Sequence, residues 1–230
     1  MWSHSLADQG FGAGDSTTNE NMACLRCDYS STDIDVRQSL SVNSIYELPF
    51  GPGKRFLTGG GAAGKLLGGW ELSGIASATS GRPINIVVDV SSSDRPEGNS
   101  RNQRPDLVPG VSIYPANQTI NNWFNPAAFA TPTTFAGTLP FTWGNLGRNV
   151  GRGPGYYETD AALEKKTAIT ERLAVKFRFE AFNLLNHPIY GDPASDISDP
   201  SFGVITGQLN DGPTGVGSSR RLQFMLRLEF

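Results

Sequence analysis

The C-terminal segment, residues 220–230, alternates between apolar and polar side chains and ends on an aromatic residue. Counting back from the C-terminus, every second residue is apolar: Phe230, Leu228, Leu226, Phe224 and Leu222. The residues between them are polar or charged except for Met225. A repeat of two places these sets on opposite faces of a strand, and the length is close to the ~9–11 residues that a tilted strand needs to cross a bilayer. We interpret the segment as the closing strand of an outer-membrane β-barrel.

Four earlier segments carry the same alternation, at residues 37–48, 70–90, 157–165 and 173–181. In the last of these, Lys176, Arg178 and Glu180 separate the apolar residues. The apolar set of this strand, with Leu222 of the closing strand, is expected to face lipid: Leu173, Val175, Phe177, Phe179 and Leu222. In residues 70–90 the even-numbered face is apolar through Ile84, Ile86 and Val88, and Gly81-Arg82-Pro83 predicts a bulge or bend.

The connections between these strands have two very different lengths. A Gly- and Pro-containing turn lies near residue 51 and another short turn lies near residue 170, whereas residues 7–35, 91–155 and 186–219 form long loops. Alternation of brief periplasmic turns with long extracellular loops is typical of bacterial barrels. The predicted fold is therefore all-β, an antiparallel transmembrane β-barrel segment of about five to six strands with long extracellular loops. Residues 1–6 are expected to be the outer end of an earlier strand.

A secreted β-sandwich shows the same repeat of two and is the main alternative fold. Its strands usually recur every ~8–12 residues, so the long connections favour a barrel.

Composition and charge restrict the partners and the location. The chain has no apolar run of ~18 residues, which argues against a transmembrane helix, and its net charge of −3 argues against nucleic-acid binding. Met1-Trp2-Ser3-His4 leads directly into a polar, Gly-rich stretch without the pattern of a signal peptide. Because an outer-membrane protein must be exported, we expect the chain to be a fragment of a longer protein.

Four motifs resemble chemical sites. Cys24 and Cys27 form a C-x-x-C that suits an incidental or loop-stapling pair better than a metal site or a redox pair, since no second Cys or His pair exists. Residues 59–65 match the spacing of a phosphate-binding loop, but Leu66 replaces the Mg²⁺-binding hydroxyl and Gly68-Gly69 interrupts the following helix, so a flexible glycine segment is expected. Residues 151–155 are Gly-rich without the strand and helix of a dinucleotide site, and Asp192, Asp196 and Asp199 lack the spacing of a Ca²⁺ loop. We expect no cofactor, no metal and no enzymatic activity.

Aromatic residues gather in the segment 114–143, which the topology places outside the membrane. Four of them are candidate loop contacts for a ligand, because exposed aromatic side chains anchor ligands: Tyr114, Trp123, Phe124 and Trp143. The alternative is that they pack the loop against itself or the barrel rim, and this alternative is favoured because compact loops bury their own side chains.

Short motifs along the whole chain resemble one known family. They include Trp2-Ser3-His4-Ser5, Asp33-x-Asp35-x-Arg37, Tyr46-Glu47-Leu48-Pro49-Phe50-Gly51, Gly69-Trp70-x-Leu72-Ser73-Gly74, Ser80-Gly81-Arg82-Pro83, Trp123-Phe124-Asn125-Pro126-Ala127-Ala128-Phe129, Gly144-Asn145-x-Gly147-Arg148-Asn149, Gly153-Pro154-Gly155 and Phe182-Asn183-Leu184-Leu185-Asn186-His187-Pro188. In this order they resemble the barrels of TonB-dependent outer-membrane receptors of the Oar-like type.

The resemblance implies that residues 1–230 are the C-terminal part of a plugged barrel of about 22 strands. It implies a location in the cell outer membrane, contact with outer-membrane lipid and, in the full-length parent, coupling to the TonB complex and import of a large, unidentified substrate. The barrel-assembly machinery reads the terminal strand in such proteins, a role that falls here on Phe224, Leu226, Leu228 and Phe230. The competing functions are a passive or structural barrel or an adhesin that binds glycans through its loops, and a secreted carbohydrate-binding sandwich.

Overall fold

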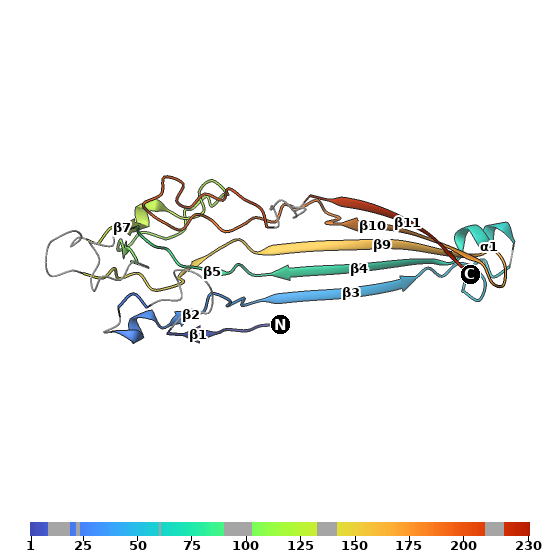
Figure 1. Cartoon of the computed structure of the whole chain (residues 1–230), viewed down its shortest axis with the longest axis horizontal. Coiled ribbons are helices and arrows are strands. Elements are labelled where there is room, and N and C mark those ends of the chain that lie inside the picture. The colour runs from blue at the N-terminus through green and yellow to red at the C-terminus, as the bar shows by residue number, and fades with distance from the viewer. Residues whose placement is uncertain (9–18, 22–23, 60, 90–102, 133–141, 210–218) are drawn as a thin grey trace. The chain divides into compact units, whose positions relative to one another are not determined.

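Five long antiparallel strands lie side by side in the computed structural model, in the order β11-β10-β9-β4-β3 (Figure 1). They are β3 (Ser39–Glu47), β4 (Trp70–Thr79), β9 (Tyr156–Ala168), β10 (Ala174–Phe182) and β11 (Arg221–Glu229). The structure describes residues 1–230 except 9–18, 22–23, 60, 90–102, 133–141 and 210–218. Each long strand pairs with the next one along the chain, so these residues form an open up-and-down sheet rather than a closed barrel.

A short turn joins β9 to β10, and a longer connection, residues 48–69, joins β3 to β4. Between β9 and β10, the backbone N–H groups of Ile169 and Thr170 donate to the Leu173 carbonyl, at 2.8 and 3.0 Å, which closes the predicted turn near residue 170. Between β3 and β4, the predicted turn near residue 51 forms with Gly51 and Gly53 at positive φ. The glycine-rich segment that follows contains a six-residue helix, α1 (Ala62–Leu67), so our expectation of a flexible segment there is wrong.

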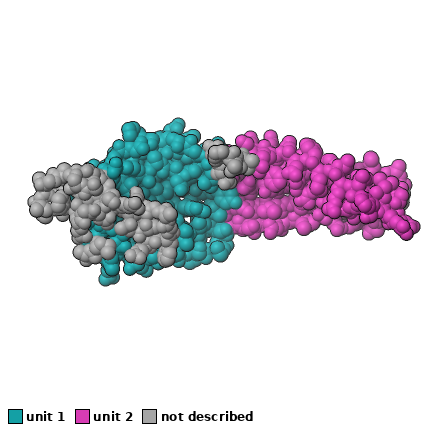
Figure 2. Space-filling view, viewed as in Figure 1, with its two compact units in different colours: residues 1–39, 79–156, 190–209 teal, residues 40–78, 157–189, 210–230 magenta. Residues whose placement is uncertain are grey.

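The chain forms two compact units, which Figure 2 distinguishes by colour. Unit 2 contains residues 40–78, 157–189 and 210–230 and so holds nearly all of the long sheet. Unit 1 contains residues 1–39, 79–156 and 190–209. Among its described residues, the regular structure consists of short strand pairs and single turns of 3₁₀ helix: β1 (Leu6–Ala7) with β2 (Ser30–Ser31), β5 (Pro83–Ile84) with β8 (Gly151–Arg152), β6 (Asp106–Leu107) with β7 (Phe129–Ala130), and the helices η2 (Leu25–Asp28) and η5 (Pro126–Ala128).

The hydrophobic core of the described residues lies in unit 1. Phe124 and Phe202 stack with their ring centroids 5.9 Å apart, and Phe129 meets Phe202 edge-on at 5.4 Å. Ile84 and Ile86 are buried in the same cluster. The prediction of one strand over residues 70–90 is therefore wrong beyond residue 79. Ile84, Ile86 and Val88 alternate as a lipid-facing strand would, but they are buried by protein.

The regular strand is interrupted at the predicted position, between Thr79 and Pro83, and close backbone packing requires glycine at Gly81. A Cβ atom at Gly81 would overlap the carbonyl oxygen of Gly153, whose own amide donates to the Arg82 carbonyl at 2.9 Å. At the N-terminus Trp2 forms an antiparallel bridge with Gln38, as expected for the end of a strand beside β3. None of the described helices has the length and apolar character needed to cross a membrane.

Candidate functional site

One face of the long sheet is apolar. The register pairs Phe177 with Leu226 and Phe179 with Phe224, and directly opposed residues share a face. The rings of Phe179 and Phe224 lie 5.0 Å apart, so the apolar residues of β10 and β11 form a continuous ladder. Leu226 is nevertheless 72% exposed and Phe224 68% exposed. Among the described residues no second sheet covers this ladder.

The apolar face continues across the other strands. Phe179 opposes Leu163 on β9, and a shallow pocket lined by Leu163, Trp70 and Leu48 connects β9 to β4 and to the end of β3. Large exposed side chains in step with Trp70 and Leu48 extend the face further: Leu40, Val42, Tyr46 and Leu72. This arrangement gives the sheet a broad apolar surface, which we call the apolar face.

The opposite face of the sheet carries a network of ion pairs. The Glu164 carboxylate lies 2.6 Å from Lys176 Nζ and 3.3 Å from Arg178 Nη1, and Arg178 also pairs with Glu180 at 2.8 Å. Nearby, Lys166 pairs with Glu229 at 2.8 Å. Pairs of this kind contribute little to stability in water, so their significance is that they give this side of the sheet a charged surface. We call this side the charged face.

The structure places the predicted terminal-strand and lipid-facing residues as follows. Leu222, Phe224, Leu226 and Leu228 lie on β11 in the apolar ladder, and Phe230 follows the strand fully exposed. Val175, Phe177 and Phe179 lie on β10 in the same ladder. Leu173 precedes β10 and belongs to the turn. Contact with lipid and with the barrel-assembly machinery stays a prediction for all of them.

The candidate ligand-binding aromatics are largely occupied by packing. Phe124 is fully buried in the core of unit 1, which agrees with the favoured alternative that these aromatic residues pack the loop against itself rather than bind a ligand. Tyr114 packs on Phe124, with the two ring centroids 5.8 Å apart. The Trp123 indole N–H donates to the Arg152 carbonyl at 2.8 Å. Trp143 is half-buried. Phe135 and Phe141, in the same aromatic segment, lie outside the described residues.

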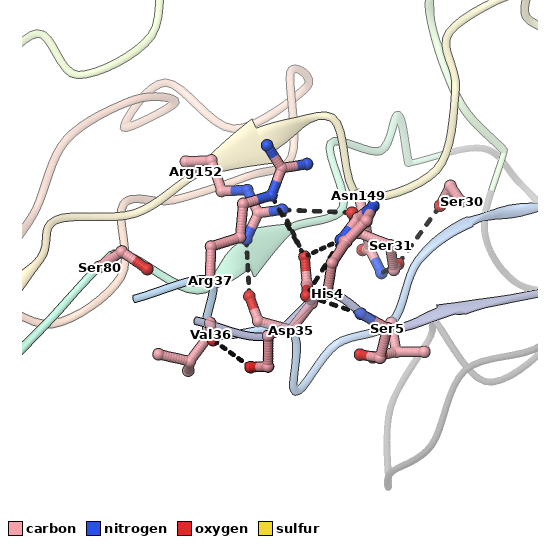
Figure 3. A network of polar contacts seen from close by, with 12 residues as sticks. His4, Ser5, Ser30, Ser31, Asp35, Val36, Arg37, Ser80, Asn149 and Arg152 are labelled. Atoms are coloured by element: carbon pink, nitrogen blue, oxygen red, sulfur yellow. Dashed lines mark hydrogen bonds and ion pairs between the residues drawn. The ribbon is translucent and has the colours of Figure 1, made fainter. Parts of the chain in front are cut away.

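A polar network in unit 1 centres on the buried carboxylate of Asp35 (Figure 3). Arg152 donates to Asp35 through Nη2 at 2.7 Å, and the Ser5 amide donates at 2.9 Å. The His4 ring lies 3.1 Å away and Arg37 Nε lies 3.5 Å away. Burial alone would raise the pKa of Asp35, but the hydrogen bonds from Arg152, Ser5 and His4 outweigh it and hold that pKa well below its usual range. Asp35 is therefore an ionised, structural carboxylate.

The same network joins segments that are far apart in the sequence. Arg152 Nη1 donates to the Asp35 carbonyl at 2.7 Å, and its amide donates to the Tyr114 hydroxyl at 2.8 Å. Asn149 Nδ2 donates to the Ser31 carbonyl and to Asp33 Oδ1, at 2.8 and 2.7 Å. Two of the sequence motifs, Asp33-x-Asp35-x-Arg37 and the one ending in Arg148-Asn149, thus meet here.

A second buried cluster lies around Arg104. Its Nη1 donates to Asp28 at 2.6 Å, its Nη2 pairs with Glu20 at 2.5 Å, and its Nε donates to the Leu146 carbonyl at 2.8 Å. Burial raises the pKa of Glu20 to about 7, with smaller contributions from the nearby carboxylates of Asp28 and Asp106, although the Arg104 guanidinium opposes the shift. No spacing signal in the sequence predicted this cluster, since its members are up to 84 residues apart.

The other chemical motifs have structural explanations. Cys24 and Cys27 form a disulfide, which confirms the loop-stapling alternative. Asp196 and Asp199 accept hydrogen bonds from backbone N–H groups of their own loop, those of Ser198 and Ser201. Among the described residues no group of three or more His, Cys, Asp or Glu side chains is arranged to hold a metal ion.

The amphipathic sheet and the loops that pack as one unit agree with a comparison against known families. A family model described as outer membrane beta barrel domain matches residues 1–223. The chain belongs to the outer membrane beta barrel domain family. The match spans both units, so this outer membrane β-barrel domain includes the loop unit as well as the sheet, and membership implies a location in the outer membrane. No curated protein and no solved structure matches the chain.

Proposed function

We propose that the chain is the C-terminal barrel portion of a TonB-dependent outer-membrane receptor of the Oar-like type. In this proposal the full-length parent binds a large substrate at the cell surface and imports it with energy passed from the inner membrane. The observation that carries the membrane part of the proposal is the division of one sheet into an exposed apolar face and an ion-paired charged face. The receptor part is supported by the set of motifs that runs through the chain in order.

The two faces suit a barrel wall between lipid and an aqueous interior. Apolar residues such as Phe224 and Leu226 would be costly to leave in water over so wide a surface, and lipid tails remove that cost. The carboxylates and ammonium groups opposite them would be costly in lipid but stay hydrated and paired in a barrel interior. Unpaired backbone at the edges of β3 and β11 would also be costly in lipid, so further strands of the parent are proposed to pair there.

Unit 1 supplies the proposed extracellular part. It contains most of the connections between β4 and β9 and between β10 and β11, which the barrel topology places outside the cell. The buried networks around Asp35 and Arg104 would keep these loops in one arrangement. Tyr114, Trp123 and Trp143, which are only partly buried, are the proposed substrate contacts, whereas Phe124 serves the core.

The proposed partners follow from this assignment. They are outer-membrane lipid, the barrel-assembly machinery acting on Phe224, Leu226, Leu228 and Phe230, the TonB complex and the substrate. The role is binding and transport rather than catalysis, and neither a cofactor nor nucleic acid takes part in it.

Energy-dependent uptake tests this function. The full-length parent would be produced in a bacterial outer membrane, with and without the TonB complex, and uptake of candidate large substrates would be measured. We expect uptake that requires TonB and surface binding that does not. Uptake that is unchanged without TonB would favour a passive barrel, and surface binding of glycans without any uptake would favour an adhesin. A secreted carbohydrate-binding sandwich would instead appear in the soluble fraction without detergent.

A further inference from the structure

The turn between β3 and β4 carries an open apolar pocket beside helix α1. Five hydrophobic side chains line it, and its volume is ≈ 310 Å³. They are Leu48, Phe50, Leu67, Trp70 and Leu163. Because Leu163 opposes Phe179 across β9 and β10, the pocket opens on the apolar face of the sheet and continues it.

Hydrogen bonds from Lys165 hold helix α1 against this face of the sheet. The Lys165 ammonium donates to three carbonyl oxygens at the C-terminal end of α1, those of Lys65, Leu66 and Gly68, at 3.1, 2.8 and 2.7 Å. It also lies 5.0 Å from the centroid of the Trp70 ring, whose indole N–H donates to the Leu66 carbonyl at 3.2 Å. Lys165 lies on the apolar face, opposite Phe177. The three carbonyl oxygens at the end of α1 satisfy its positive charge there.

The surroundings of the pocket combine apolar and cationic side chains. Leu66 is 70% exposed, and Phe56 and Leu67 are also exposed. Lys65 is exposed on α1, and the Arg55 guanidinium lies 5.4 Å from the centroid of the Phe56 ring. Exposed leucine and aromatic residues next to cations are characteristic of segments that lie at the boundary between headgroups and acyl chains.

We propose that this pocket binds an acyl chain of a phospholipid and that α1 lies along the periplasmic boundary of the outer membrane. This inference rests on the proposed function, because it requires the apolar face to meet lipid. An acyl chain is the occupant that the observations favour, since all lining residues are hydrophobic and the pocket is continuous with the apolar face. The cations Arg55 and Lys65 complement the phosphate of the same lipid.

Quenching of tryptophan fluorescence tests the proposal, because Trp70 forms part of the pocket wall. The full chain would be reconstituted in phosphatidylcholine vesicles whose acyl chains carry bromine near the carbonyl end or near the methyl end. Wild type would be compared with Trp70→Phe and, as a matched control, with Trp123→Phe, since Trp123 donates to Arg152 within unit 1. We expect Trp70→Phe to lose most of the bromine-quenchable emission and Trp123→Phe to retain it. Bromine near the carbonyl end should quench more strongly than bromine near the methyl end.

A second pair of variants keeps the test independent of the Trp70 substitution. Leu67 lines the pocket and Leu57 is exposed outside it, so Leu67→Ser should weaken quenching of Trp70 and Leu57→Ser should leave it unchanged. Equal quenchable emission in Trp70→Phe and Trp123→Phe, or equal effects of the two serine variants, would overturn the proposal. So would stronger quenching from the methyl end.

Washing the same vesicles with alkaline carbonate separates the two proposals. A chain that resists extraction but shows no quenching of Trp70 overturns the acyl-chain site alone. A chain that the wash releases overturns the membrane-spanning assignment, and with it the inference that depends on it.

Discussion

Phe177 on β10 lies directly opposite Leu226 on β11, and the next pair along the same strands joins Lys176 to Arg227. One step of the backbone therefore moves from an exposed apolar ladder to a face crossed by ion pairs. A single sheet presenting these two environments suits a wall between lipid and water, which is the physical basis of the outer-membrane assignment.

Substitution of Phe177 by arginine should destabilise the protein in a bilayer. Phe177 lies near the middle of β10, so Phe177→Arg would place a charge close to the bilayer midplane, at a cost of about 2–4 kcal/mol. The measurement is the free energy of unfolding in phospholipid vesicles, followed by urea titration.

Lys176→Arg is the matched control, because Lys176 lies on the charged face beside Glu164. It should change the free energy of unfolding by less than ~0.5 kcal/mol. Equal losses of unfolding free energy at the two neighbouring positions would contradict the assignment of Phe177 to the lipid side of β10 and Lys176 to the other side.

Alternation in the sequence predicted β10 and β11 well because one side of each strand is uncovered and the other is charged. The same rule failed at Ile84, Ile86 and Val88, which are buried in unit 1. A repeat of two reports that one side is apolar, but lipid and protein interior give the same repeat. The prediction of a flexible glycine-rich segment before β4 failed for another reason. Lys165, about 100 residues away, binds the end of α1, and a contact this distant in the sequence leaves no local signal.

The polar networks were beyond prediction from the sequence for a similar reason. Asp33, Asp35 and Arg37 are recognisable as a motif, but nothing in it indicates that Arg152 is the partner of Asp35, 117 residues away. Long-range contacts of this kind depend on how the loops pack, which local pattern does not determine. For Cys24 and Cys27 the C-x-x-C spacing offered a disulfide only as one of several alternatives, and the structure shows that they form one.

Loss of the Arg152 guanidinium should destabilise the structure of unit 1 around Asp35. Arg152→Met removes its guanidinium donors from the buried Asp35 carboxylate and from the Asp35 carbonyl, and leaving a buried charge without its principal partner costs about 3 kcal/mol. Hydrogen exchange of the amides around residues 31–37 and 149–152 is the measurement, and faster exchange is expected.

Arg37→Met provides the comparison for Arg152→Met. The Arg37 side chain is 51% exposed and lies 3.5 Å from Asp35, so its removal should cost no more than about 1 kcal/mol. A larger effect from Arg37 than from Arg152 would show that we have assigned the network to the wrong guanidinium.

Acid should weaken unit 1 through Asp35. Because the folded-state pKa of Asp35 is lowered, its stabilising contribution is fully present above the unfolded pKa of about 4 and is lost as the pH falls towards the folded pKa. Hydrogen exchange at about pH 7 and about pH 3, corrected for intrinsic rates, should show this loss in wild type. In Asp35→Asn the protection should be low at both values, and an acid-dependent loss of the same size in that variant would exclude Asp35 as its origin.

Removal of the Lys165 charge should free helix α1. Lys165→Met keeps the apolar stem but loses three hydrogen bonds to the end of the helix, so amides of residues 62–68 should exchange at least about tenfold faster, the equivalent of one charge-assisted hydrogen bond. Lys166→Met, which removes the pair with Glu229 on the charged face, should leave those amides unchanged. Similar exchange in both variants would contradict the role of Lys165.

Cysteine labelling at two adjacent positions of β11 tests the central claim most directly. The native Cys24 and Cys27 are joined in a disulfide, so they do not compete with a new thiol for the reagent. In membranes carrying the full-length protein, Arg227→Cys should react with a water-soluble maleimide, whereas Leu226→Cys should react only with a reagent dissolved in the lipid phase. Equal reaction of both thiols with the water-soluble reagent, or the reverse pattern, would contradict a sheet that separates lipid from water.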